Sequence, residues 1–184
     1  EGRLSFEGHD IKVVDLPGIY SFSTYSLEET VAREYIALEK PDAVINVVDA
    51  SVLERNLFFT LQLMELNVPL IICLNQVDVA KNKGIITDVK KMKKLLGVPV
   101  VPTVAVRGEG LTDLVRETLS VANSGCIQPA LKYGAEVETR IQRLIGLADE
   151  AGLGLPYPAR WVAIKLLERD PDITKAVSEK APEI

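Results

Sequence analysis

The sequence predicts an α/β fold in which a mostly parallel sheet carries helices on both faces, followed by a small all-helical subdomain. Apolar runs rich in valine and isoleucine lie at 11–14, 43–48 and 69–74. They are continuous rather than alternating, which is typical of strands covered on both faces. Segments with helical spacing separate them, and alternation of strand and helix is the pattern of a parallel sheet.

A hairpin is expected at the start of the chain. Residues 3–6 and 11–14 are short strand-like runs joined by Glu7-Gly8-His9-Asp10. Such a turn joins antiparallel neighbours, so we expect one antiparallel edge strand on the sheet. A weaker apolar run at 98–101 predicts a further strand.

The first helix is expected to begin at Ser26, which forms a capping box with Glu29. Its predicted core-facing stripe consists of Leu27, Val31, Tyr35 and Leu38. Further helices are expected at 53–64, 87–96 and 111–119.

The pattern changes after about Asn123. Two helical segments at 134–152 and 158–169 follow, and Asp170-Pro171 is a cap for a third. We therefore divide the chain into an α/β domain over residues 1–123 and a helical domain over residues 124–184.

Composition excludes several classes of function. The 184 residues carry a formal net charge of -5, which argues against nucleic acid as a partner. The single histidine and the distant Cys73 and Cys126 do not make an iron site, and Cys73 in its apolar run predicts a buried free thiol. The chain contains neither a signal peptide nor an apolar stretch as long as a membrane span.

Three polar segments each follow a predicted strand. The first is Asp15-Leu16-Pro17-Gly18, whose carboxylate would emerge at the carboxyl end of the sheet, where open α/β folds bind ligands. Asp15 is placed there to bind Mg²⁺ through water, and Gly18 lets the backbone approach a terminal phosphate. Taken alone, this pattern also describes an ordinary turn.

The second segment is Asn75-Gln76-Val77-Asp78, after the run at 69–74. The Asp78 carboxylate can accept from both N1–H and the N2 amine of guanine, a bidentate contact that adenine cannot return. Asn75 would tie neighbouring loops together and contact the edge of the base.

The third segment is Thr103-Val104-Ala105, after the run at 98–101. The backbone N–H of Ala105 could donate to guanine O6, although for this segment taken alone a plain transition from strand to loop is the preferred interpretation. The three segments follow three strands in chain order with helices of normal length between them, which independent turns would rarely do.

These segments resemble the third, fourth and fifth signature motifs of a Ras-like GTPase, with Gln76 in place of the more common lysine. The chain resembles the FeoB ferrous iron transporter family more closely still. The residues that carry this resemblance lie at 15–21, 31–35, 46–50, 53–57, 132–134 and 158–168.

The resemblance implies a GTPase (G) domain over 1–123, truncated at its N-terminus, and a GDI-like helical domain over 124–184. It implies GTP or GDP with Mg²⁺ as cofactors, bound by Asp15, Gly18, Asn75, Gln76, Asp78, Thr103, Val104 and Ala105. It further implies regulation of Fe²⁺ uptake by slow GTP hydrolysis, at the cytoplasmic face of the membrane. The expected partners are a C-terminal membrane permease domain of the same protein and other copies in a homo-oligomer.

A phosphate-binding loop of the form G-x-x-x-x-G-K-[ST] does not occur in these residues. We therefore expect the 184 residues alone to bind GTP poorly, and we interpret them as beginning downstream of that loop. The alternative is a non-catalytic interaction domain, or pseudo-GTPase, that kept the fold without the chemistry. Ile19 stands where related enzymes often carry a water-orienting glutamine, which predicts slow hydrolysis.

Overall fold

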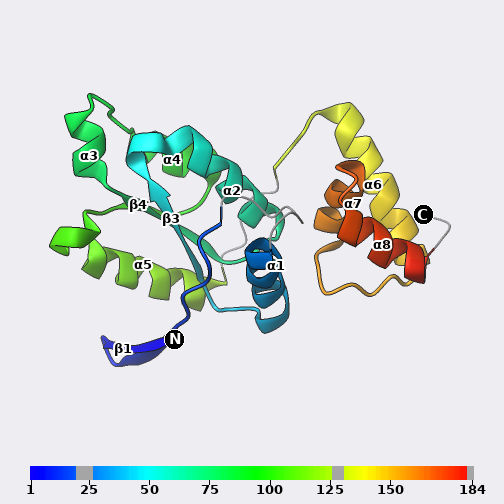
Figure 1. The fold of residues 1–184 in the computed structure, drawn as a ribbon, viewed down its shortest axis with the longest axis horizontal. Coiled ribbons are helices and arrows are strands. Elements are labelled where there is room, and N and C mark those ends of the chain that lie inside the picture. Colours follow the sequence, from blue (N-terminus) through cyan, green and yellow to red (C-terminus); the bar gives the residue numbers. More distant parts are fainter. Residues whose placement is uncertain (20–26, 126–130, 182–184) are drawn as a thin grey trace.

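The computed structural model describes residues 1–19, 27–125 and 131–181, and it has two lobes with α1 between them (Figure 1). The elements of the α/β lobe are β1 (Gly2–Phe6), β2 (His9–Val13), α1 (Leu27–Glu39), β3 (Val44–Asp49), α2 (Leu53–Glu65), β4 (Leu70–Asn75), α3 (Val77–Asn82), α4 (Val89–Leu96), β5 (Val100–Pro102) and α5 (Leu111–Ser124). The helical lobe contains α6 (Ala135–Glu150), α7 (Ala159–Leu167) and α8 (Pro171–Lys180). The predicted fold class is confirmed, and the boundary at 123 and 124 stays a prediction.

The parallel sheet has the strand order β3-β4-β5. Its central strand β4 is the most buried, with Leu70, Ile71, Ile72 and Leu74 at 0% exposure. The register pairs Asp49 of β3 with Asn75 of β4, and Leu74 of β4 with Pro102 of β5. The sheet therefore brings the segments that follow β4 and β5 to the same edge.

The predicted antiparallel hairpin of β1 and β2 forms, but its turn is only Glu7-Gly8, because His9 in β2 already pairs with Phe6. It does not extend the parallel sheet, however, because in the described residues β2 pairs with β1 alone. The outer edge of β3 is left open on that side, and Ile45 and Val47 on one face of β3 are 40% and 60% exposed. The expected antiparallel strand is thus present but belongs to a separate two-stranded sheet.

The prediction of which face of α1 packs against the core is wrong. Leu27 and Leu38 are 77% and 61% exposed. The buried residues of α1 are Ala32, Arg33, Ile36 and Ala37. The buried face includes two alanines, which permit close approach, and an arginine whose burial depends on partners in the other lobe. Ser26 lies outside the described residues, so the capping box is not tested.

Arg33 connects the two lobes. Its side chain is 3% exposed, and its Nη2 lies 3.3 Å from Oδ2 of Asp172 in α8. Its guanidinium carbon lies 5.9 Å from the ring centroids of both Tyr157 and Trp161. A buried cation needs such partners, so α1 is held to α7, α8 and the loop between α6 and α7.

The helical lobe is organised around Trp161, which is fully buried. Arg160 beside it donates to the Glu138 carboxylate and to the Leu131 carbonyl. The hydrogen bond from Arg160 lowers the pKa of Glu138. Asp170 caps α8 by accepting from the Ile173 N–H at 3.1 Å, as the sequence predicts.

Glu65 lies at the end of α2, next to charged residues of α7 and its C-terminal end. Burial, and secondarily the carboxylate of Glu168, raise the pKa of Glu65 to about 7, while Lys165 and Arg160 act in the opposite direction. The pKa of Glu65 in the folded protein exceeds the ordinary value of 4.5, so the folded state holds this proton more tightly than the unfolded state does. The contribution of Glu65 to the free energy of unfolding is therefore fully present below about pH 4.5 and is lost as the pH rises through about 7.

We expect Glu65→Gln to stabilise the protein above about pH 7 and to have little effect near pH 5. The amide cannot ionise, so the variant does not incur the desolvation that the wild-type carboxylate undergoes at high pH. Urea unfolding at both pH values measures the difference. Glu54→Gln, at an exposed position of the same helix, is the control. An effect of Glu65→Gln that is the same at both pH values would contradict the assignment.

Candidate functional site

The candidate site lies at the carboxyl ends of β4 and β5. Asn75, the last residue of β4, is half-buried, and its Oδ1 accepts two hydrogen bonds. The donors are the Ala105 N–H at 3.0 Å and the Thr103 hydroxyl at 3.1 Å. The predicted tie between neighbouring loops is therefore present, and the second and third sequence segments lie together.

Backbone contacts support this arrangement. The Thr103 N–H donates to the Leu74 carbonyl at 2.8 Å, and the Val77 N–H lies 3.5 Å from the Thr103 carbonyl. Gln76 has φ of 60°, a left-handed conformation that turns the chain from β4 directly into α3. Its own side chain is exposed. None of the helices expected from the sequence corresponds to α3, which has only six residues.

Asp78 occupies the first turn of α3, where a carboxylate complements the helix dipole. Its Oδ2 lies 3.4 Å from Nη2 of Arg107, and the Asp78 side chain is 26% exposed. Arg107 is not among the site residues that the sequence predicts. Its position in the sequence offers a signal, because Arg107 is a basic residue only two positions after Ala105, which was expected to contact the base.

The loop after β5 is a short structured turn. Ala105–Arg107 form a 3₁₀ turn, and the backbones of Val104 and Glu109 bond to each other on either side of it. Gly110 closes the loop with φ of 78°. A Cβ placed there would lie 2.3 Å from the Pro102 carbonyl oxygen, so the position requires glycine.

Cys73 and Thr103 lie beneath the polar edge. The Thr103 hydroxyl is 3.3 Å from the Cys73 Sγ, and both residues are buried. Burial raises the pKa of the Cys73 thiol, although the Thr103 contact opposes it. The predicted buried free thiol at Cys73 is confirmed, whereas Cys126 lies outside the described residues.

Asp15 and Gly18 lie in the segment after β2, and both are exposed. Leu16 and Ile19 pack against the main core and fix this segment on the α/β lobe. In the described part of the chain no hydrogen bond or ion pair joins Asp15 to Asn75, Asp78 or Ala105. The structure thus joins Asn75, Thr103 and Ala105 by hydrogen bonds, while the binding roles predicted for these residues and for Asp15 and Gly18 stay predictions.

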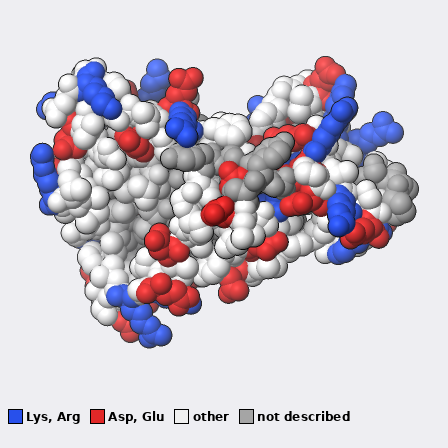
Figure 2. Space-filling view, viewed as in Figure 1, with Lys and Arg blue, Asp and Glu red and all other residues white. Residues whose placement is uncertain are grey.

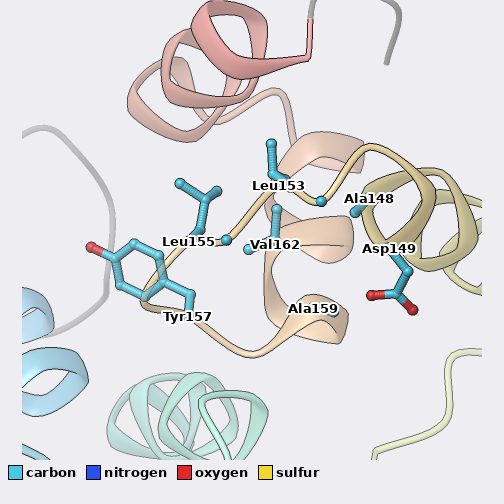
Figure 3. A pocket seen from close by; sticks show the side chains of 9 residues that line it. Ala148, Asp149, Leu153, Leu155, Tyr157, Ala159 and Val162 are labelled. Atoms are coloured by element: carbon cyan, nitrogen blue, oxygen red, sulfur yellow. The ribbon is translucent and has the colours of Figure 1, made fainter.

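Two cavities in the described part of the chain lie away from this edge. One of about 240 Å³ is in the helical lobe, between the end of α6, the following loop and α7 (Figure 3). A second, of about 660 Å³, is lined by the segments preceding β3 and β4, at the opposite end of the sheet from Asn75. Neither cavity is lined by Asn75, Asp78 or Ala105.

Acidic and basic side chains are interspersed on the face in Figure 2, without a broad basic patch. Among the described residues no cluster of three metal-ligating side chains occurs. In the same residues, no helix combines the length and the apolar character that crossing a bilayer requires.

Comparison with known families gives two matches. The family described as ferrous iron transport protein B matches residues 1–118, and the FeoB cytosolic helical domain matches residues 133–184. The second match begins at residue 133, just before α6 begins at Ala135.

Curated relatives agree. An Fe(2+) transport protein A/Fe(2+) transporter FeoB fusion protein of Porphyromonas gingivalis is 40% identical over 98% of this chain. The Fe(2+) transporter FeoB of Escherichia coli is 37% identical over 92% of it. The chain covers 22% of the length of each of these relatives.

Solved structures share the fold. The cytosolic domain of the T. maritima FeoB iron transporter, in a GMPPNP form, matches the whole chain with 33% identity and a TM-score of 0.89, and the chain covers 72% of it. A GDP form of the same domain has the same identity and TM-score, with 71% of it covered. The FeoB G-domain of Methanococcus jannaschii is 49% identical over 66% of this chain, with a TM-score of 0.63 and 77% of it covered.

We expect Gly110→Ala to destabilise the protein by about 3 kcal/mol or more, because left-handed strain is combined with a backbone clash. Gly84→Ala is the matched control, since φ is 75° there and a Cβ meets nothing within 4 Å. The control should lose only about 1 kcal/mol, from strain alone. Urea unfolding compares the two, and equal losses would show that the contact with Pro102 is unimportant.

Proposed function

The chain belongs to the FeoB family of ferrous iron transport proteins, and from this premise we propose that it is a GTP-binding, slowly GTP-hydrolysing regulatory domain of a ferrous iron transporter. The observation that carries the proposal is the edge formed by Asn75, Asp78 and Ala105. It combines a carboxylate, a carboxamide and a backbone donor on two adjacent loops. These are the groups that a site needs to distinguish guanine from adenine.

Each group has a role in this proposal. Asp78 accepts from N1–H and the N2 amine of guanine, and the backbone N–H of Ala105 donates to O6. In this proposal guanine O6 takes the Ala105 N–H that Asn75 Oδ1 accepts in this structure, and Asn75 Oδ1 keeps the Thr103 hydroxyl. The amide N–H groups of Asn75 are left for the base. Thr103 supports Asn75 from below, while Gln76 and Val104 shape the backbone on either side.

The phosphate side of the proposed site involves Asp15 and Gly18. An exposed Asp15 carboxylate fits Mg²⁺, which prefers carboxylate oxygen and keeps several waters and phosphate oxygens as its other ligands. The absence of a three-residue metal cluster among the described residues agrees with a cation held mainly by nucleotide and water. Gly18 offers its N–H to the terminal phosphate, and Mg²⁺ would neutralise the phosphate charge there.

Hydrolysis is expected to be slow. Ile19 follows Gly18, and its side chain is partly buried against the core. An alkyl side chain cannot orient an attacking water, so in this proposal other groups must do so.

Strong nucleotide binding also requires a phosphate-binding loop, which the 184 residues do not contain. The T. maritima FeoB domain has GMPPNP and GDP forms, which supports a guanine nucleotide as the ligand. We propose that the loop is supplied by a longer form of the protein, in which a membrane permease domain carries Fe²⁺ and this domain lies on the cytoplasmic side. Homo-oligomer formation is part of the same proposal. A non-catalytic interaction domain is the alternative.

A fluorescent GDP analogue with Mg²⁺, titrated against the 184 residues and against a longer form that carries a phosphate-binding loop, tests the proposal. We expect binding by the longer form and weak or no binding by the 184 residues, because the loop supplies the main phosphate contacts. Failure of both to bind would favour the interaction domain.

Base recognition has a separate test in the longer form. Asp78→Asn replaces an acceptor with a donor, so we expect preference to move from guanosine toward xanthosine diphosphate by at least about tenfold. Competition against the fluorescent analogue measures the ratio. Asp113→Asn, at an exposed position of α5, is the control, and an unchanged ratio in Asp78→Asn would remove Asp78 from the site.

A further inference from the structure

Arg107 forms an ion pair with the Asp78 carboxylate, which is the group proposed to bind the guanine base. Its Nη2 lies 3.4 Å from Oδ2 of Asp78, and its Nη1 lies 3.9 Å from Oε1 of Glu109. Because Asp78 has one carboxylate, a guanine base and Arg107 cannot both take the same oxygen at full strength.

The chemistry of the two donors is similar. The guanidinium of arginine is a planar group with parallel N–H donors that suit a carboxylate. The N1–H and N2 amine of guanine form the same kind of fork, attached to one carbon. Arg107 can therefore satisfy Asp78 in the way that the base would.

The loop keeps Arg107 within reach of Asp78. Arg107 ends the 3₁₀ turn that begins at Ala105, and Gly108 follows with φ of 73°. The same turn presents the Ala105 N–H, which here donates to Asn75 Oδ1. Two groups proposed to bind the base therefore already have partners within the protein. The Asp78 carboxylate pairs with Arg107, and the Ala105 N–H donates to Asn75.

The pair is exposed, which limits its strength. The Arg107 side chain is 61% exposed, so water screens its attraction to Asp78. Exposed pairs of this kind change an equilibrium by a factor of roughly two to five. Arg107 is therefore strong enough to adjust affinity and weak enough for a nucleotide to displace it.

We propose that Arg107 is an intramolecular competitor of guanine for Asp78 and thereby lowers the affinity of the site for guanine nucleotides. This inference rests on the proposed function, because it assumes that Asp78 reads the base. It adds a residue that sets affinity from within the loop, through the chemical group that the base itself presents.

The test is Arg107→Ala in the longer form that carries a phosphate-binding loop. Titration and stopped-flow mixing with the fluorescent GDP analogue should show roughly two- to fivefold tighter binding, because guanine no longer displaces a partner of Asp78. Arg116→Ala is the matched control. Arg116 is 55% exposed and also contacts two acids, Glu7 and Asp113, so the same charge is removed elsewhere.

The Asp78→Asn background separates competition from a general effect of charge. With xanthosine nucleotide in that background, removal of Arg107 should change affinity by less than the measured error, because the shared carboxylate is gone. Unchanged or weaker guanine binding by Arg107→Ala, or an equal gain in Arg116→Ala, would overturn the inference. Absence of guanine binding in the unmutated longer form would instead overturn the proposed function, and this inference with it.

Discussion

One acceptor atom, Oδ1 of Asn75, holds the carboxyl ends of β4 and β5 together. It receives the Thr103 hydroxyl from below and the Ala105 N–H from the following loop. Both donors depend on the parallel register of β4 and β5, which places these segments side by side. Without this acceptor a buried hydroxyl and a backbone N–H would lose a partner, and the loop that carries Arg107 would lose its anchor.

The strand that carries Asn75 also connects the site to the rest of the molecule. β4 is buried along almost its whole length, so its position is set by packing rather than by the loops. The main hydrophobic core includes residues of β4, of α1 and of the helical lobe, Trp161 among them. The segment containing Asp15 and Gly18 precedes α1, and α1 is attached to the helical lobe by Arg33. Leu16 and Ile19, which flank this segment's Gly18, pack against the same core as Ile36 and Trp161.

The sequence predicted those features that local patterns determine. Continuous apolar runs identified β3 and β4, and the spacing of polar residues after them identified Asn75 and Asp78. It could not predict the buried face of α1, because the burial of Arg33 depends on Tyr157, Trp161 and Asp172, which lie more than a hundred residues away. The pairing of Arg107 with Asp78 likewise depends on how two loops fold. Local sequence also could not show that β1 and β2 form a sheet of their own, because pairing between strands distant in sequence is not specified by short-range patterns.

The central claim is that the edge at Asn75, Asp78 and Ala105 reads guanine. Hydrogen–deuterium exchange of the longer form, with GDP and with ADP at equal concentration, tests it most directly, because backbone protection reports where a ligand orders the chain. We expect GDP to protect peptides spanning 73–78 and 103–107, and ADP to leave them unprotected. Equal protection by both nucleotides, or protection confined to other segments, would contradict it.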